Sequence, residues 1–443
     1  MKKTFSLILL VLISMTLIGC KNNNPVPIYG DVVFYIIGDL EQYITENEDY
    51  NDLGFVAKDN KADISEYVSV NNLVDNSTVG TYTISYTLDY QDKITTLTKT
   101  VHVLYLNAAC DLIPGTNTLE CYKNWSSYLH TVVTVKIYFN QYENINSLEV
   151  FDEMENIISL YHKLSDKYNT YDGFVNINTI NNNPSSTIVI TKELFDLIDF
   201  TLEHQKDVSN SFNAALGPVI EIWHDYRENC LTNQICEVPT MADLENASNY
   251  TNPKDVILDY ENYTITMKEN MSLDLGGVSK GYISKKLVEY LNTLPLDGYL
   301  INNGESNISI GGTHPTRENG LFLLAITDPT FALPYYATIY LSDGDQLITS
   351  GDYQQYYLVD DVLYHHIINN VTLMPERYFR SVSIIYNDPA LGDLYSTAIF
   401  TMTIKDGQDF VNSIIGLEAI WYGMDGTIYY SDNFEDTYLD TLY

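Results

Sequence analysis

A glycine-rich junction at residues 273–281 constrains the fold of this chain more than any other segment. It reads Leu-Asp-Leu-Gly-Gly-Val-Ser-Lys-Gly, and apolar residues at helical spacing follow it from Tyr282 to Leu291. The pattern predicts a strand that enters a helix through a tight turn. Glycines leave the backbone open to a ligand, and a helix N-terminus offers N–H groups to an anion. With Lys280 nearby, the junction predicts a site for a phosphate-bearing nucleotide, and a purely architectural turn is the alternative.

The first residues predict export and attachment to a membrane. Lys2 and Lys3 precede an apolar run at 5–18 that is short for a bilayer span, and the sequence Leu-Ile-Gly-Cys ending at Cys20 resembles a bacterial lipobox. We therefore expect a signal peptide at 1–19 and a lipid anchor on Cys20, which would hold the protein at the extracytoplasmic face of the cell membrane. An ordinary cleaved signal with an incidental cysteine is the alternative.

The acidic composition excludes nucleic acid as a partner. The 443 residues include 59 Asp and Glu against 23 Lys and Arg, so the net charge is −36. Cleavage before Cys20 would remove Lys2 and Lys3 and no acid, which changes the charge to −38. Nucleic acid phosphates require the opposite sign, and anionic lipid headgroups would also be repelled. The length predicts two or three domains.

Four further cysteines have spacings that suggest two short disulfide loops. Outside the cytoplasm the natural pairs are Cys110 with Cys121 and Cys230 with Cys236. Buried free thiols are the alternative. Neither spacing is typical of a zinc site.

Period-two alternation predicts an all-β first domain. Residues 81–88 and 96–103 alternate between apolar and polar side chains, and an apolar run covers 32–37. The pattern resembles a bacterial immunoglobulin-like surface domain, which implies a small β-sandwich. We place this sandwich at 26–106, between linkers at 20–25 and 107–122, and interpret it as a spacer or adhesive module.

Helical and strand patterns mix in residues 123–443, which predicts an α+β fold for the larger domain. Apolar residues three and four apart predict helices at 150–164 and 194–202, and 393–402 resembles a buried helix. Strands are expected at 132–139, 299–301, 321–326, 337–341, 381–386 and 419–422.

Six motifs of this domain occur in an order that resembles the FAD:protein FMN transferase (ApbE-type) family. They read FNAALGP from Phe212, DLGGVSKG from Asp274, NNGESN from Asn302, TSGDY from Thr349, HHII from His365 and DLYSTA from Asp393. The resemblance runs roughly from Tyr128 to the C-terminus and implies an ApbE-like (T-fold-like) catalytic domain of mixed helix and sheet. It also implies a Mg²⁺-dependent enzyme that cuts the pyrophosphate of FAD. Such an enzyme attaches FMN to a Thr or Ser of an exported acceptor protein and releases AMP.

The resemblance implies a metal site formed by Gly277, Asp393 and Thr397. Asp393 and Thr397 are four residues apart, so on a helix their oxygens face one side, and hard oxygen donors suit Mg²⁺. The backbone carbonyl that completes the family's protein ligands corresponds to Gly277. The alternative interpretation of Asp393 is a helix N-terminal acid that interacts with the dipole, with Thr397 packed beneath it.

His366 and Asp393 are the candidate catalytic residues. We expect His366 near the phosphates, as a hydrogen-bond donor or proton shuttle, and His365 must point the other way if the segment is extended. Asp393 could also accept the proton of the acceptor hydroxyl, a role that conflicts in part with metal ligation. Lys280 and the N–H groups of the glycine loop are expected to hold the pyrophosphate.

The remaining FAD contacts also follow from the resemblance. Leu129 stands in the place of a family methionine that touches the flavin. Tyr168 is expected to stack on an aromatic ring, with Tyr171 as the alternative. The residues expected to line the nucleotide or to contact its ribose and phosphates are Ser211, Phe212, Asn213, Asp274 and Lys280.

The chain departs from the family pattern at two of these motifs. Asn213 stands where the family has aspartate. The family run His-Ile-Ile-Asp-Pro-x-Thr-Gly appears at 366–373 with Asn369, Asn370 and Leu373 in place of the aspartate, proline and glycine. These changes keep two alternatives open: an FAD pyrophosphatase that yields FMN and AMP, and a non-catalytic flavin-binding surface lipoprotein.

Overall fold

The computed structural model describes residues 31–129, 131–208 and 210–443. The chain divides into two compact units, Met1–Leu106 and Asn107–Tyr443, and each is described by itself. The expected signal peptide, the lipidation site Cys20 and the linker at 20–25 lie outside the described residues. Within those described ranges, no helix is both long enough and apolar enough to cross a membrane.

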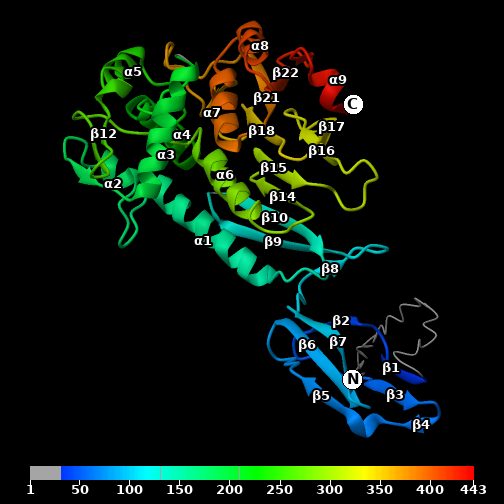
Figure 1. Ribbon diagram of the computed structural model, residues 1–443. Helices are drawn as coiled ribbons and strands as arrows, with labels where there is room; N and C mark the ends of the chain where they lie inside the picture. The colour runs from blue at the N-terminus through cyan, green and yellow to red at the C-terminus, as the bar shows by residue number, and fades with distance from the viewer. Residues whose placement is uncertain (1–30, 130, 209) are drawn as a thin grey trace, which may run out of the picture. The chain divides into compact units, whose positions relative to one another are not determined.

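The first unit is built from strands in two small sheets (Figure 1). One sheet has the order β1-β3-β4, and the other has the order β2-β7-β6-β5 with β2 parallel to β7. Alternate residues of the long strand β6 are buried, so the period-two pattern supplies one face to the core. The predicted strands are confirmed. The strands are β1 (Val32–Ile36), β2 (Glu41–Thr45), β3 (Phe55–Asp59), β4 (Ala62–Asp63), β5 (Val68–Asn72), β6 (Gly80–Tyr90) and β7 (Lys93–Leu104).

A 9-stranded antiparallel sheet forms the centre of the second unit, with the order β23-β22-β21-β18-β15-β14-β10-β9-β8. The predicted strands at 132–139, 299–301, 381–386 and 419–422 all lie in it. Its strands are β8 (Asp111–Leu112), β9 (Thr118–Tyr128), β10 (Thr131–Asn140), β14 (Gly298–Asn303), β15 (Asn307–Gly312), β18 (Gln346–Gly351), β21 (Phe379–Tyr386), β22 (Glu418–Gly423) and β23 (Ile428–Tyr430).

Helices cover one face of this sheet (Figure 1). Helix α1 (Ser147–Ser165) contacts β9, α6 (Ser279–Leu291) contacts β14 and β15, α7 (Pro389–Phe400) contacts β18 and β21, and α8 (Ile404–Ser413) contacts β22. The main hydrophobic core lies between these helices and the sheet. Helices predicted at 150–164, 194–202 and 393–402 are confirmed as α1, α3 and α7, so the α+β class is confirmed.

A second core, centred on Phe322, Ile339, Leu347 and Phe434, joins the large sheet to a 3-stranded sheet of order β16-β17-β24. Helices α2 to α5, the sheet β11-β13-β12 and the hairpin β19-β20 complete the unit. The bounds are α2 (Ile177–Asn181), β11 (Ile188–Val189), α3 (Lys192–His204), α4 (Gly217–Asn233), α5 (Met241–Ser248), β12 (Ile257–Asp259), β13 (Thr264–Thr266), β16 (Phe322–Thr327), β17 (Tyr335–Leu341), β19 (Tyr356–Val359), β20 (Val362–His365), α9 (Phe434–Tyr438) and β24 (Leu439–Leu442).

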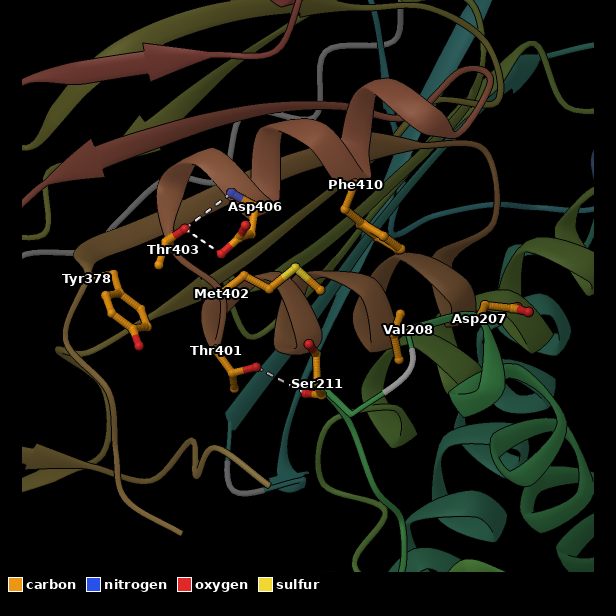
Figure 2. Close-up of a pocket in the computed structure, with 9 residues that line it drawn as sticks. All are labelled: Asp207, Val208, Ser211, Tyr378, Thr401, Met402, Thr403, Asp406 and Phe410. Atoms are coloured by element: carbon orange, nitrogen blue, oxygen red, sulfur yellow. Dashed lines mark hydrogen bonds between the residues drawn. The ribbon is translucent and has the colours of Figure 1, made fainter. Parts of the chain in front are cut away.

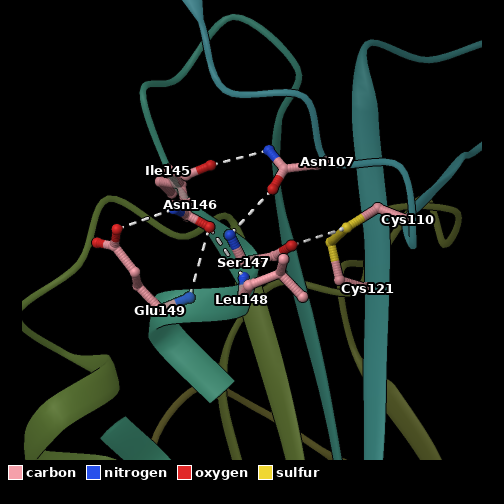
Figure 3. Close-up of a disulfide and its surroundings, with 8 residues drawn as sticks. All are labelled: Asn107, Cys110, Cys121, Ile145, Asn146, Ser147, Leu148 and Glu149. Carbon is pink, nitrogen blue, oxygen red and sulfur yellow. Dashed lines mark hydrogen bonds between the residues drawn. A yellow bond between two sulfur atoms is a disulfide. The ribbon is translucent and has the colours of Figure 1, made fainter. Parts of the chain in front are cut away.

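Residues 107–122, expected as a linker, belong instead to the second unit. They contain β8 and the first residues of β9, which pair at the edge of the large sheet. The disulfide Cys110–Cys121 closes a loop within this segment (Figure 3). The Asn107 amide donates to the Ile145 carbonyl and its oxygen accepts the Ser147 N–H, which attaches the segment to the start of α1. The second expected disulfide, Cys230–Cys236, is also formed.

Candidate active site

The glycine-rich junction and α7 approach each other closely at Gly281. A Cβ atom at this position would lie 2.2 Å from the carbonyl oxygen of Pro389 and 2.5 Å from the Cβ of Asp393. The Gly281 N–H donates a hydrogen bond of 2.8 Å to Asp393 Oδ2. The missing side chain therefore lets the carboxylate of Asp393 reach the first turn of α6.

The three residues expected as metal ligands lie on the two segments that meet at this contact. Thr397 Oγ1 donates to the main-chain carbonyl of Asp393 at 3.0 Å, one turn earlier in α7, and lies 3.5 Å from the Gly277 carbonyl oxygen. A Cβ atom on Gly277 would lie 3.0 Å from Thr397 Oγ1. Asp393 is not a cap of its own helix, because Asp388 is the N-cap of α7. The helix terminus that Asp393 contacts belongs to α6.

The donor set of this cluster fits a magnesium ion. Asp393 is 5% exposed, and burial raises its pKa, against the opposing charge of Lys280 and the Gly281 N–H. A carboxylate held in this way gains stability from a nearby cation. A carboxylate, a hydroxyl and a carbonyl are hard oxygen donors, which Mg²⁺ prefers together with water and phosphate. The described residues contain no cluster of three or more His, Cys, Asp or Glu side chains that would suit another metal.

The glycine loop offers fewer N–H groups to a phosphate than its sequence predicts. The Gly276 N–H donates to Asp274 Oδ1 at 2.8 Å, and the N–H groups of Val278 and Ser279 donate to the Leu275 carbonyl. The Gly281 N–H is bonded to Asp393. Side-chain cations must therefore supply most of the attraction for a diphosphate.

Lys280 points from the first turn of α6 toward the turn between β14 and β15. Its Nζ donates to Ser306 Oγ at 2.5 Å. Its charge opposes the burial that raises the pKa of Asp393, and adds to the burial that lowers the pKa of His366. The motif that begins at Asn302 thus lies beside the metal-ligand cluster. Leu129 precedes β10, which pairs with β14, so it lies at the same end of the sheet.

His365 and His366 are directed to different segments, as expected. His365 is buried, accepts the Ile367 N–H at Nδ1 and donates from Nε2 to the Glu376 carbonyl at 2.7 Å. His366 Nδ1 lies 3.3 Å from the Gln355 carbonyl. Burial and the nearby His365, Lys280 and Arg227 lower the pKa of His366 to about 3. His366 is therefore neutral at pH 7, and it lies close enough to Lys280 for the charge of the lysine to lower its pKa.

Comparison with known proteins decides the family. Residues 129–421 match the model of the ApbE family, and residues 34–103 match the model described as "Bacterial surface protein, Ig-like domain". The chain belongs to the ApbE family. Its first unit is an immunoglobulin-like domain, and its second unit is hereafter called the ApbE domain.

Curated relatives and solved structures agree with this family. A FAD:protein FMN transferase of Klebsiella pneumoniae is 28% identical over 240 residues, which cover 53% of this chain and 70% of that protein. The corresponding enzyme of Treponema pallidum is 24% identical and covers 54% of this chain and 67% of that protein. The fold resembles that of the ApbE protein of Thermotoga maritima (24% identity, TM-score 0.60, 71% and 98% coverage). It also resembles the fold of the flavinyl transferase ApbE of Pseudomonas stutzeri. The identity is 19%, the TM-score is 0.61, and the match covers 73% of this chain and 98% of that chain.

Of the two tyrosines expected as a stacking residue, Tyr168 has the more exposed side chain. Tyr168 is 47% exposed, whereas the hydroxyl of Tyr171 donates to Asp166 at 2.6 Å and lies 3.3 Å from His162 Nε2. The ring of Tyr168 is already in contact with Lys167 and His224. A ligand ring would share Tyr168 with these two side chains.

Phe212 and Ser211 lie in different surroundings. Phe212 is 2.8 Å from the position of a Cβ on Gly277, beside the metal-ligand cluster. Ser211 instead lines a pocket of about 380 Å³ with Asp207, Thr401 and Asp406 (Figure 2). None of the other expected site residues lines this pocket, and its two carboxylates make it a poor place for a phosphate.

The departures from the ApbE pattern contact each other. The amide of Asn213 donates to the Thr251 carbonyl at 2.8 Å and to Asn370 Oδ1 at 3.2 Å. Leu373, which replaces the family's glycine, keeps a left-handed backbone with φ of 61°. The turn therefore retains the backbone that a glycine would adopt, and an amide pair replaces the charged group.

Sequence reasoning missed a group of basic residues beside the site. Lys167 follows α1, and His224 and Arg227 lie on α4, a helix that we did not predict. Lys167 pairs with Asp274, and Arg227 bonds to Gln355 as well as to His224 on its own helix. Asp274 and Gln355 are each more than a hundred residues away along the chain from the residue they contact. The available signal was the position of Lys167 directly before the expected stacking residue Tyr168.

Proposed function

We propose that this protein is a flavinyltransferase that moves FMN from FAD to a Thr or Ser hydroxyl of an exported acceptor protein and releases AMP. The observation that carries the proposal is the close approach of α7, which bears Asp393 and Thr397, to the glycine loop at Gly277 and Gly281. The curated relatives, which are named FAD:protein FMN transferase, support the same reaction.

The residues of the site have separate roles in phosphoryl transfer. Gly277, Asp393 and Thr397 would hold Mg²⁺, which when bound neutralises charge on the phosphates. Lys280 attracts the diphosphate, and Ser306 orients the lysine through its 2.5 Å hydrogen bond. The acceptor oxygen forms a bond to the FMN phosphorus as the bond from that phosphorus to the AMP oxygen breaks, and AMP takes the electron pair.

In this proposal His366 is the general base that accepts the proton of the acceptor hydroxyl. The Gln355 carbonyl can only accept, so the hydrogen-bond pattern assigns a proton to His366 Nδ1 and leaves Nε2 as an acceptor. Burial and the charges of Lys280 and Arg227 weaken this base before a nucleotide binds. A bound diphosphate offsets those charges and makes His366 a stronger base. Asp393 is less suited, because Gly281 and the proposed metal occupy it.

We also propose that Cys20 is lipidated and that the protein acts at the outer face of the cell membrane. The lipobox-like sequence before Cys20 supports this placement. Two disulfides are consistent with an oxidising compartment.

Incubation of the purified protein with FAD, Mg²⁺ and an acceptor protein with an exposed threonine tests the proposed reaction. We expect covalent flavin fluorescence on the acceptor after denaturing electrophoresis, and one AMP for each flavin attached. An acceptor with that threonine changed to alanine is the control. Release of AMP without labelled acceptor would indicate an FAD pyrophosphatase, and intact FAD would indicate a flavin-binding protein without catalysis.

A further inference from the structure

A nearly buried ion pair lies at the entrance to the glycine loop. Lys167 Nζ is 2.7 Å from Asp274 Oδ2, and the two side chains are 13% and 12% exposed. Glu221 is more distant, at 3.9 Å, and half exposed. Although burial pushes the pKa of Asp274 upward, the charge and hydrogen bond of Lys167 hold it below its ordinary value. Asp274 therefore stays ionised, and Lys167 is its closest counter-charge.

The other oxygen of Asp274 connects this pair to the loop. Asp274 Oδ1 accepts the Gly276 N–H at 2.8 Å, and the Asp274 N–H donates to the Ala214 carbonyl. Asp274 thus holds the turn that presents the Gly277 carbonyl. A carboxylate at this place repels a diphosphate unless a cation neutralises it. The chain needs Asp274 for the turn and needs Lys167 to cancel its charge.

Lys167 also begins a polar network that ends at His366. Its Nζ lies 4.8 Å from the centre of the Tyr168 ring, and the Tyr168 hydroxyl is 3.4 Å from His224 Nδ1. Arg227 donates to His224 at 2.9 Å and to the side chain of Gln355 at 3.3 Å. Gln355 is the residue whose carbonyl faces His366. The network therefore connects the Lys167–Asp274 pair to the segment that contacts His366.

We infer that Lys167 is a positioning residue for the diphosphate of the flavin dinucleotide, acting by neutralising Asp274 at the glycine loop. The inference rests on the proposed function, because it takes FAD as the ligand. It predicts that loss of Lys167 weakens FAD binding because the charge of Asp274 is left unpaired. Removal of the Asp274 charge should then restore FAD binding.

Equilibrium binding of FAD and of riboflavin to the full chain, measured by flavin fluorescence, tests this inference. We expect Lys167→Met to raise the Kd of FAD about tenfold or more, since it leaves a buried carboxylate unpaired. Riboflavin lacks phosphate, so its Kd should change less than about twofold. Lys167→Arg should restore FAD binding to within about threefold of the wild-type value. The matched control is Lys405→Met, which removes an equal charge from an exposed pair with Asp409.

A double-mutant cycle separates the role of Lys167 from a general loss of structure. In the Asp274→Asn background, Lys167→Met should change the Kd of FAD less than about threefold. An equal loss in both backgrounds, or an equal loss for riboflavin, would overturn the inference. If Lys167→Met alone does not fold, the comparison of Asp274→Asn with the double variant decides the question. If the wild type binds FAD and Lys167→Met has no effect on the Kd, this inference alone is overturned. If the wild type binds no FAD, the proposed function is overturned as well.

Discussion

Asp393 is buried between two helices, and its carboxylate accepts a hydrogen bond from the first turn of α6. An acid in this position has lost most of its water, which is why burial raises its pKa. Such a group is costly to keep unless a cation shares the site. The same residue therefore links the packing of α6 on α7 to the proposed chemistry of the site.

Asp393→Asn should reduce the turnover of FAD about a thousandfold, because the amide keeps the shape but cannot neutralise a divalent cation. Thermal unfolding in EDTA should show no loss of stability, since the change removes a buried charge. The control is Asp388→Asn at the N-cap of the same helix, where asparagine caps equally well and turnover should persist. Undiminished turnover of Asp393→Asn would remove the metal site from the mechanism.

His365 should make the stability of the ApbE domain depend on pH. Burial lowers its pKa to about 4, below its ordinary value of about 6.5 in the unfolded chain. Between these values the unfolded chain binds the extra proton, so stability is complete above about pH 6.5 and falls by about 3 kcal/mol as the pH drops toward 4. The difference in unfolding free energy between wild type and His365→Gln, measured by urea titration, should shrink accordingly. A difference that is constant with pH would contradict this account.

At the scale of elements, the contact between α6 and α7 depends on Gly281. Gly281→Ala should lower the unfolding free energy by about 3 kcal/mol, because its methyl group would overlap the Pro389 carbonyl and the Cβ of Asp393. Calorimetry would measure the loss. Gly407→Ala on α8 is the matched control, since its Cβ would meet its nearest neighbours at 3.3 Å and its effect should stay within about 1 kcal/mol. Equal effects of the two changes would argue against a tight contact at Gly281.

The long periodic elements could be predicted from sequence, and the short or two-sided ones could not. Helix α1 buries one regular stripe, and β6 buries alternate residues, so each pattern stands out. Helix α4 was missed because it packs Val219 and Trp223 into a small core and carries the charged residues of the site on other sides. Strands β11 to β13 have two or three residues each, too few to show a period.

The same distinction holds for the site. Gly277, Lys280, Asp393 and Thr397 sit in motifs that resemble those of the family, so the resemblance was sufficient to propose them. The roles of Lys167 and Arg227 depend on contacts with Asp274 and Gln355, which lie on other segments. Sequence spacing cannot show such long-range pairs.

At the scale of the whole molecule, the two units have separate hydrophobic cores. A fragment that begins at Asn107 should therefore fold with a single cooperative transition and bind FAD with an affinity within about threefold of the full chain. Calorimetry and fluorescence titration would measure both properties. The fragment must begin before Cys110, because a start at the expected boundary of 123 would remove β8, one disulfide and the first residues of β9. Failure of the longer fragment to fold would show that the ApbE domain needs its partner unit.

Lys280, whose described hydrogen-bond partner is the neutral Ser306, affects the rate at which a ligand binds. The molecule carries a net charge of −36, so an anionic dinucleotide in solution meets repulsion at long range and attraction only near Lys280. Added salt shortens the screening length to about 8 Å at 0.15 M, which removes the distant repulsion before it weakens the close contacts. FAD should therefore associate faster as the ionic strength rises from very low values, the opposite of the behaviour of a nucleotide enzyme with a basic surface.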